Sequence, residues 1–89
     1  MITQDDAWRI ARKLKADIHP GRRHELAVLR HKGNYIAQFG ISRGSREQSH
    51  DYIPRQLFIT HKQCRDLRDC PMTLEGYIDI LAGKGLLSR

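Results

Sequence analysis

The feature that most constrains the fold is a turn signal between two apolar segments near the middle of the chain. Residues 26–29 form a short apolar run, and the Lys-Gly-Asn step at 32–34 follows it with residues that tolerate a positive φ. From 35 to 42 apolar and polar residues alternate. This pattern predicts a β-hairpin with one mainly apolar face. The residues expected on that face of the second strand are Tyr35, Ala37, Phe39 and Ile41.

A helix is predicted before the hairpin. Thr3 is a good N-cap, and Asp5 and Asp6 follow it in the first turn, where carboxylates interact favourably with the positive end of the helix dipole. The His-Pro-Gly step within 17–23 predicts a break between this helix and the hairpin. Apolar residues of the helix recur at i, i+3, i+4 and i+7, at Ala7, Ile10, Ala11 and Leu14.

The stretch 52–59 is open to two interpretations. As a strand it would alternate apolar residues, but Pro54 would restrict it to the edge of a sheet. As a helix it would be capped by Asp51, with Pro54 in the first turn. We favour a short helix or turn and keep the strand as the alternative. The polar segment 43–51 before it is expected to be an exposed loop.

Two helices are predicted in the last third of the chain. The capping-box pattern Thr-His-Lys-Gln at 60–63 precedes a helix at 61–69. Thr73 would cap the second helix, and Gly83 or Gly85 would end it. Two leucines after this helix are expected to fold back onto the core. The apolar stripe of the second helix comprises Leu74, Tyr77, Ile78 and Leu81.

The length of the chain limits it to one core. A chain of 89 residues buries only roughly 60–65% of its unfolded surface, so we expect a single domain over 1–89. The apolar face of a hairpin needs helices to cover it. The predicted fold is therefore α+β: an N-terminal helix, an antiparallel hairpin or small sheet with a possible third strand, and C-terminal helices packed on one face.

Charge is concentrated in one part of the chain. Residues 9–46 hold ten basic and two acidic side chains, a local balance of +8, whereas residues 47–89 hold six of each. The formal net charge is +6. A surplus confined to one segment creates a positive field in which a polyanion can bind, so nucleic acid is the expected partner. The residues expected to bind it are Arg9, Arg12, Lys13, Arg22, Arg23, Arg30, Lys32, Arg43 and Arg46.

Several other kinds of site are not indicated. The sequence contains no phosphate-loop or dinucleotide motif, and the last predicted helix is too acidic for a DNA-recognition helix. The aromatic pattern of an RNA-recognition motif is missing, because Tyr35 and Phe39 are expected in the core. Cys64 and Cys70 are interpreted as reduced thiols packed as small apolar groups. No metal and no cofactor are expected.

Histidines are the candidates for catalysis. A histidine titrates near neutrality and suits acid–base cleavage of RNA, in which the 2′-hydroxyl is the nucleophile. His31 in the basic hairpin turn and His50 in the long loop are the best placed to meet a ligand. Each is a candidate general acid or base, with an ordinary surface histidine as the alternative.

The C-terminal part of the chain contains the pairs Thr73-Leu74, Ile80-Leu81 and Gly85-Leu86. In these pairs, in its size, in its opening helix and in its basic hairpin the chain resembles the HicA-type toxins, which are small basic mRNA interferases with a fold like that of double-stranded-RNA-binding domains. The resemblance implies a metal-independent endoribonuclease, an RNA ligand and an antitoxin-like protein partner. The family's Gly-Ser/Thr-His step, whose histidine is catalytic, is not matched: 33–35 is Gly-Asn-Tyr, and 44–46 is Gly-Ser-Arg. No catalytic residue is carried over, and the helix at 61–69 is an addition.

The expected location is the cytoplasm, without membrane contact. No apolar run approaches the roughly 18 residues of a membrane span, and the N-terminus lacks the features of a signal peptide. The function expected first is RNA binding, with toxin-type ribonuclease activity as its enzymatic form. The alternatives are a non-catalytic accessory protein that binds DNA or RNA and a protein–protein adaptor with a basic face.

Overall fold

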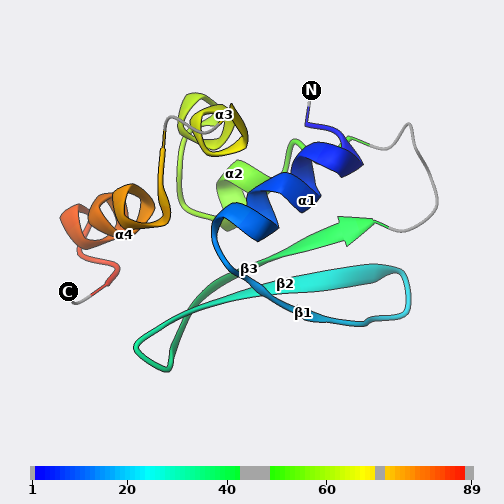
Figure 1. The fold of residues 1–89 in the computed structure, drawn as a ribbon, viewed down its shortest axis with the longest axis horizontal. Helices are drawn as coiled ribbons and strands as arrows, with labels where there is room; N and C mark the ends of the chain where they lie inside the picture. The colour runs from blue at the N-terminus through cyan, green and yellow to red at the C-terminus, as the bar shows by residue number, and fades with distance from the viewer. Residues whose placement is uncertain (1, 43–48, 70–71, 88–89) are drawn as a thin grey trace.

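The computed structural model describes residues 2–42, 49–69 and 72–87. It shows the predicted α+β fold, with a helix first, an antiparallel sheet next and helices last (Figure 1). The elements in chain order are α1 (Gln4–Lys13), β1 (Asp17–His19), β2 (His24–His31), β3 (Asn34–Ser42), α2 (Ile53–Gln56), α3 (His61–Asp69) and α4 (Leu74–Gly83).

The sheet contains the predicted hairpin and a third strand. Strands β2 and β3 are antiparallel, and the turn between them contains Lys32 and Gly33, whose φ angles are 53° and 81°. Two central residues with positive φ give a turn whose twist matches that of the strands. Strand β1 pairs with the other side of β2. The third strand therefore comes from 17–19, whereas the stretch 52–59 contains α2, in agreement with the helical interpretation.

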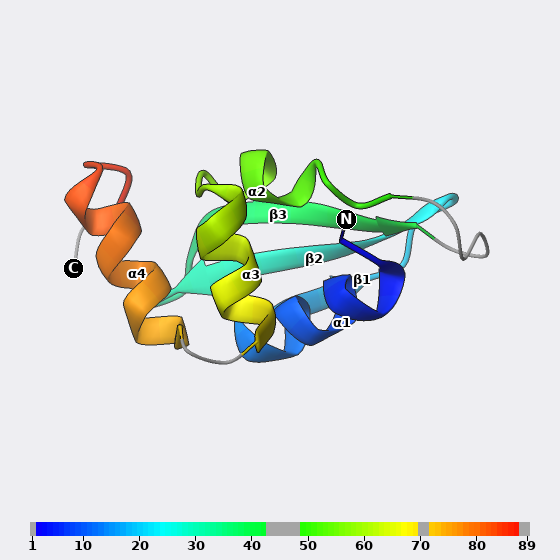
Figure 2. The same ribbon diagram turned by 90° about the horizontal axis from the view of Figure 1, so that it is seen from above.

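The helices are arranged around one face and the edges of this sheet. Helices α1 and α3 lie side by side, and α2 lies along β3 (Figure 2). Helix α4 lies at the hairpin-turn end of the sheet, on the same side of the sheet as the other helices (Figure 1). On the other face of the sheet, Leu26 and Val28 lie outside the core cluster. The buried core includes Ile10, Phe39, Leu57, Leu67 and Leu81.

A register shift in the hairpin changes which side chains reach the core. The pairing slips by one residue between Leu29 and Arg30, so that Arg30 pairs with Tyr35 and Ile36 is an extra residue on β3. Ile36 packs against the core, whereas Tyr35 is 58% exposed. The prediction that Tyr35 lies on the apolar face is wrong, because a bulge reverses the alternation of side chains. The other residues predicted on that face are buried, namely Ala37, Phe39 and Ile41.

Side chains from the segment after β3 occupy the outer edge of this strand. The Gly40 N–H donates a hydrogen bond to Gln56 Oε1 at 3.2 Å, and the Gly40 carbonyl accepts one from the Tyr52 hydroxyl. The Ser42 N–H donates to His50 Nε2 at 3.0 Å. An unpaired strand edge is a template on which another chain can add a strand. These bonds close that edge over Gly40 and Ser42.

The predicted N-caps at Thr3, Thr60 and Thr73 are confirmed, whereas the predicted cap at Asp51 is wrong. Helix α2 begins after Tyr52 without a side-chain cap, because the Asp51 carboxylate accepts a hydrogen bond from the Ile2 N–H at 2.7 Å instead. Thr3 and Asp6 form a capping box at α1, and Thr60 and Gln63 exchange the same two bonds at α3, at 2.9 and 3.1 Å. The Thr73 hydroxyl accepts from the N–H of the third residue of α4. These bonds satisfy backbone donors that a helix leaves without partners. The sequence also predicts that Pro71 ends the helix at 61–69, and this proline lies outside the described residues.

The residues after α4 follow the prediction only in part. Helix α4 ends at Gly83, and Leu87 packs against the core. Leu86 is 52% exposed, so the prediction that both leucines fold back is wrong for Leu86. The chain turns at Gly85, where φ is 74°, and after this turn Leu87 lies against the core while Leu86 is exposed.

Candidate nucleic-acid interface

The predicted basic residues of α1 lie away from its buried stripe. Arg9 and Arg12 are exposed, and Lys13 is half-buried. This arrangement follows from the helical repeat, which turns residues between the apolar positions toward solvent. The buried residues of α1 are Ala7, Ile10 and Ala11.

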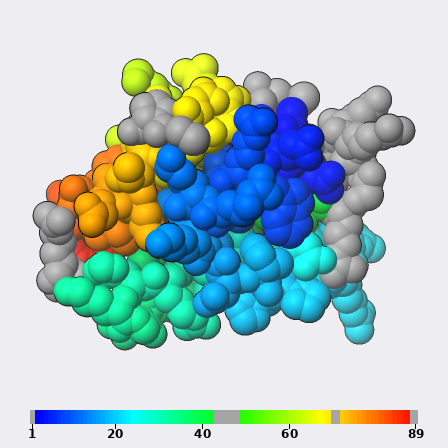
Figure 3. Space-filling model, viewed as in Figure 1, coloured from blue at the N-terminus to red at the C-terminus, as the bar shows by residue number. Residues whose placement is uncertain are grey.

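A groove between α1 and α3 brings these cations together. It has a volume of about 430 Å³, and we call it the α1–α3 groove. Figure 3 views this face of the molecule, with α1 across its centre and α3 above it. Guanidinium groups that line a groove can bind phosphate oxygens through several donors at once. The lining residues are Arg9, Arg12, Lys13, Leu67 and Arg68.

Two acidic residues hold Arg68 in position. Its Nε and Nη2 atoms donate to the two carboxylate oxygens of Asp69 at 2.8 and 2.9 Å, and Asp6 Oδ2 of α1 lies 3.7 Å from Nη1. The hydrogen bond from Arg68 lowers the pKa of the Asp69 carboxyl. The guanidinium is thus largely neutralised. Among the described residues, no acid lies within ion-pair distance of Arg9 or Arg12, although the charge of Arg9 also helps to lower the pKa of the Asp69 carboxyl. Arg9 and Arg12 therefore keep more of their positive charge uncompensated than Arg68 does.

Arg68 is the site residue that sequence reasoning missed. It belongs to the part of the chain where positive and negative charges balance, and only the packing of α3 on α1 brings it to the groove. The sequence does contain one usable signal. Arg68 directly follows Leu67, whose apolar side chain is buried, so it must emerge at the border of the buried stripe of α3.

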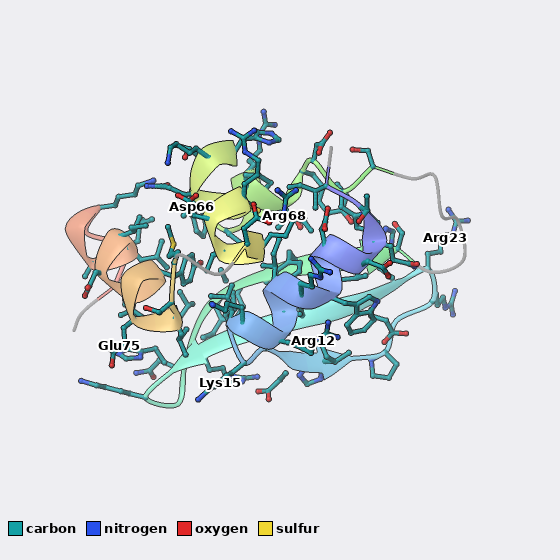
Figure 4. All side chains as sticks on the ribbon, turned by 45° about the horizontal axis from the view of Figure 1, so that its top comes forward. Arg12, Lys15, Arg23, Asp66, Arg68 and Glu75 are labelled. Atoms are coloured by element: carbon teal, nitrogen blue, oxygen red, sulfur yellow. The ribbon has the colours of Figure 1, made fainter. Side chains whose placement is uncertain are left out.

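The four basic residues around β2 do not meet at one site. Arg22 and Arg23 are exposed in the β1–β2 connection, whereas Arg30 and Lys32 lie at the other end of β2. This strand has 8 residues, which at about 3.3 Å per residue separates its ends by roughly 25 Å. Figure 4 shows Arg23 at the end of the molecule opposite the hairpin turn. Two further predicted residues lie outside the described part of the chain, Arg43 and Arg46.

His31 lies in a hollow between the hairpin turn and α4. The hollow has a volume of about 390 Å³, and the His31 ring is half-buried in its wall. Lys32 and Glu75 also line it, and Figure 4 shows Glu75 at the start of α4, close to the hairpin. The residues that line this hollow therefore carry an imidazole, an ammonium group and a carboxylate. These groups can move a proton and stabilise negative charge on a phosphoryl group.

His50 lies in the interior and not in an exposed loop. Its side chain is fully buried, Nε2 accepts from the Ser42 N–H, and its backbone N–H donates to the Ile2 carbonyl at 2.8 Å. Its ring centroid is 5.7 Å from that of Tyr52. The prediction that His50 is placed to meet a ligand is wrong, because the ring has no exposed surface and one nitrogen is already bonded. His50 instead closes the edge of β3.

Other kinds of site receive no support from the described residues. Cys64 is buried and free, and burial raises the pKa of its thiol to about 11, as suits an inert packed thiol. Cys70 lies outside the described residues. Within 2–42, 49–69 and 72–87, no three His, Cys, Asp or Glu side chains gather as metal ligands would. None of the helices described there has the length and apolar character needed to cross a membrane.

The structure thus contains two chemically distinct sites: the α1–α3 groove, which is lined by guanidinium groups, and the hollow around His31, which is lined by residues with acid–base groups. Comparison with protein-family models, curated proteins and solved structures finds no match to this chain. The functional inference therefore depends on the residues of the chain itself.

Proposed function

We propose that this protein binds nucleic acid, RNA in preference to DNA, through the basic face around the α1–α3 groove. The observation that carries the proposal is the pair Arg9 and Arg12, which are exposed and form no close ion pair among the described residues, beside Arg68 in one groove. The net charge of +6 adds long-range attraction for a polyanion. The resemblance to HicA-type toxins supports RNA as the ligand and an antitoxin-like protein as a second partner.

We expect binding to weaken steeply as salt is added. If about five phosphates are neutralised, log K should fall against log salt with a slope near −3.5 on single-stranded RNA or −4.5 on a duplex. The measurement is fluorescence anisotropy of a labelled oligoribonucleotide across a potassium chloride series, with DNA of the same sequence in parallel. A slope near zero would contradict binding through phosphates. If the protein binds neither nucleic acid, the remaining hypothesis is the protein–protein adaptor, in which the basic face binds an acidic protein.

Ribonuclease activity is the second candidate, and the hollow around His31 favours it. In this reaction a base removes the proton of the 2′-hydroxyl, and the resulting oxygen attacks the adjacent phosphorus. The bond from phosphorus to the 5′-oxygen breaks, and an acid returns a proton to that oxygen. The products are a 2′,3′-cyclic phosphate and a 5′-hydroxyl. His31 is suited to one of the two proton transfers, and Lys32 to the charge on phosphorus.

If the protein is a ribonuclease, His31→Ala should reduce cleavage about 10²–10⁴-fold, the usual contribution of a general acid or base. RNA binding should be retained, since a neutral imidazole adds little to phosphate affinity. The measurement is the cleavage rate of a labelled RNA, with chelator present, followed by analysis of the product ends. His24→Ala is the matched control, because this exposed histidine lies outside the hollow. If the wild-type protein leaves RNA intact both with and without divalent metal, the ribonuclease hypothesis is wrong and only the proposed RNA binding stands.

A further inference from the structure

The hairpin carries an exposed aromatic ring beside two cations. We call Arg30, Lys32 and Tyr35 the hairpin tip. Tyr35 is 58% exposed, more than any other large hydrophobic side chain of the described residues. Arg30 is its direct cross-strand partner, and Lys32 lies in the turn between them. An aromatic ring and guanidinium and ammonium groups therefore share one small, accessible surface.

The backbone directs Tyr35 to this surface. Regular pairing would have continued the alternation and placed Tyr35 on the same face as Ala37. The register shift instead makes Ile36 the extra residue, which packs against the core, and leaves Tyr35 opposite Arg30 on the other face. Bulges commonly redirect a side chain next to a functional site. The outward position of Tyr35 is thus built into the hairpin.

Lys15 connects the hairpin tip with the α1–α3 groove. Asp17 of β1 pairs with Val28, and its Oδ2 lies 3.6 Å from Arg30 Nε, so the residues just before β1 run beside Arg30. Lys15 is exposed in that segment, and Figure 4 shows it between the end of α1 and the hairpin. Positive charge therefore continues from Arg12 past Lys15 to the hairpin tip.

We propose that the ligand is single-stranded RNA, with one base stacked on Tyr35 and the neighbouring phosphates bound by Arg30 and Lys32. This inference rests on the proposed nucleic-acid function. Unpaired bases stack on exposed aromatic rings, whereas the bases of a duplex are stacked on one another and unavailable. Because every base has a π face, the contact is tolerant of sequence.

The ion pair with Asp17 leaves Arg30 able to bind phosphate. A guanidinium group has five N–H donors, and the close contact with Asp17 Oδ2 is made by Nε. Both side chains are open to solvent, with exposed fractions of 47% for Arg30 and 64% for Asp17. An exposed pair of this kind is weak and yields readily to a second anion.

The test compares Tyr35→Ala with the wild-type protein on one RNA sequence, as a single strand and as a duplex. We expect single-strand affinity to fall about 5- to 150-fold, the range of a base–aromatic stack, while duplex affinity is unchanged. The slope of log K against log salt should stay the same, since no phosphate contact is lost. Tyr35→Phe should bind like the wild type. Phe58→Ala is the matched control, because it removes another exposed ring that lies outside the hairpin tip and the groove.

Wild-type affinity of Tyr35→Ala for the single strand would overturn the stacking inference. Equal losses on single strand and duplex would also overturn it, because stacking requires a selective loss. In both cases the proposed function stands if reversing the charge of Arg9 and Arg12 still weakens binding. If the wild-type protein binds neither RNA nor DNA, both the proposed function and this inference are wrong.

Discussion

Replacing Arg9 and Arg12 together with glutamate should lower the affinity for RNA by at least about 10²-fold. A hydrogen bond to a charged group contributes about 1.5–3 kcal/mol, so two lost contacts correspond to roughly 10²–10⁴-fold. The slope of log K against log salt should become shallower by about 1.4 on a single strand, because two phosphates are no longer neutralised. Anisotropy titrations over a salt series give both quantities. Neither side chain is buried, so the fold should be retained.

The control for this double variant is Arg55→Glu with Lys62→Glu. Both residues are exposed and neither lines the α1–α3 groove, while the change in net charge is the same. This control should lose far less affinity, since it removes long-range attraction and no phosphate contact. Equal losses in the two double variants would show that total charge, and not the groove, determines binding.

Phe39→Ala should destabilise the protein by about 3–5 kcal/mol. The Phe39 ring is fully buried on β3, and its removal leaves a cavity in the single core beneath the helices. A domain of this length has roughly 5–13 kcal/mol of stability, so the loss is a large part of the total. Chemical denaturation gives the free energy of unfolding, and the thermal midpoint should fall by about 15 °C or more.

Tyr35→Ala serves as the stability control on the same strand. It removes an aromatic ring of similar size, but that ring is mostly exposed, so the change should be small. A Phe39→Ala protein as stable as Tyr35→Ala would contradict the placement of the core on that face of β3.

The parts of the fold that the sequence predicts are those fixed by short-range chemistry. The caps at Thr3, Thr60 and Thr73 involve bonds within three residues, and the turn at Lys32 and Gly33 requires only residues that tolerate positive φ. Helical periodicity likewise predicts the buried stripes. These features can be predicted from the sequence because both partners of each interaction lie in one segment of the chain.

The features that could not be predicted depend on contacts between distant segments. Strand β1 has three residues, all exposed, and shows no periodicity of its own. The bulge at Ile36 leaves no mark in an alternating sequence. His50 is buried because Ser42 offers it a backbone donor, and Arg68 reaches the groove because α3 packs on α1. Each depends on a partner that the local sequence does not identify.

The closed edge of β3 affects how a histidine scan of this protein would have to be interpreted. An alanine at 50 would uncover the Ser42 N–H on an edge strand, and a bare strand edge invites self-association. The variant would then lose function by becoming insoluble. An activity assay on whole cells cannot distinguish this loss from the loss of a catalytic group. An alanine at 31 leaves this edge intact. For each variant, the soluble fraction and the specific activity of the purified protein must therefore be measured separately. A histidine with a structural role lowers the first, whereas a catalytic histidine lowers the second.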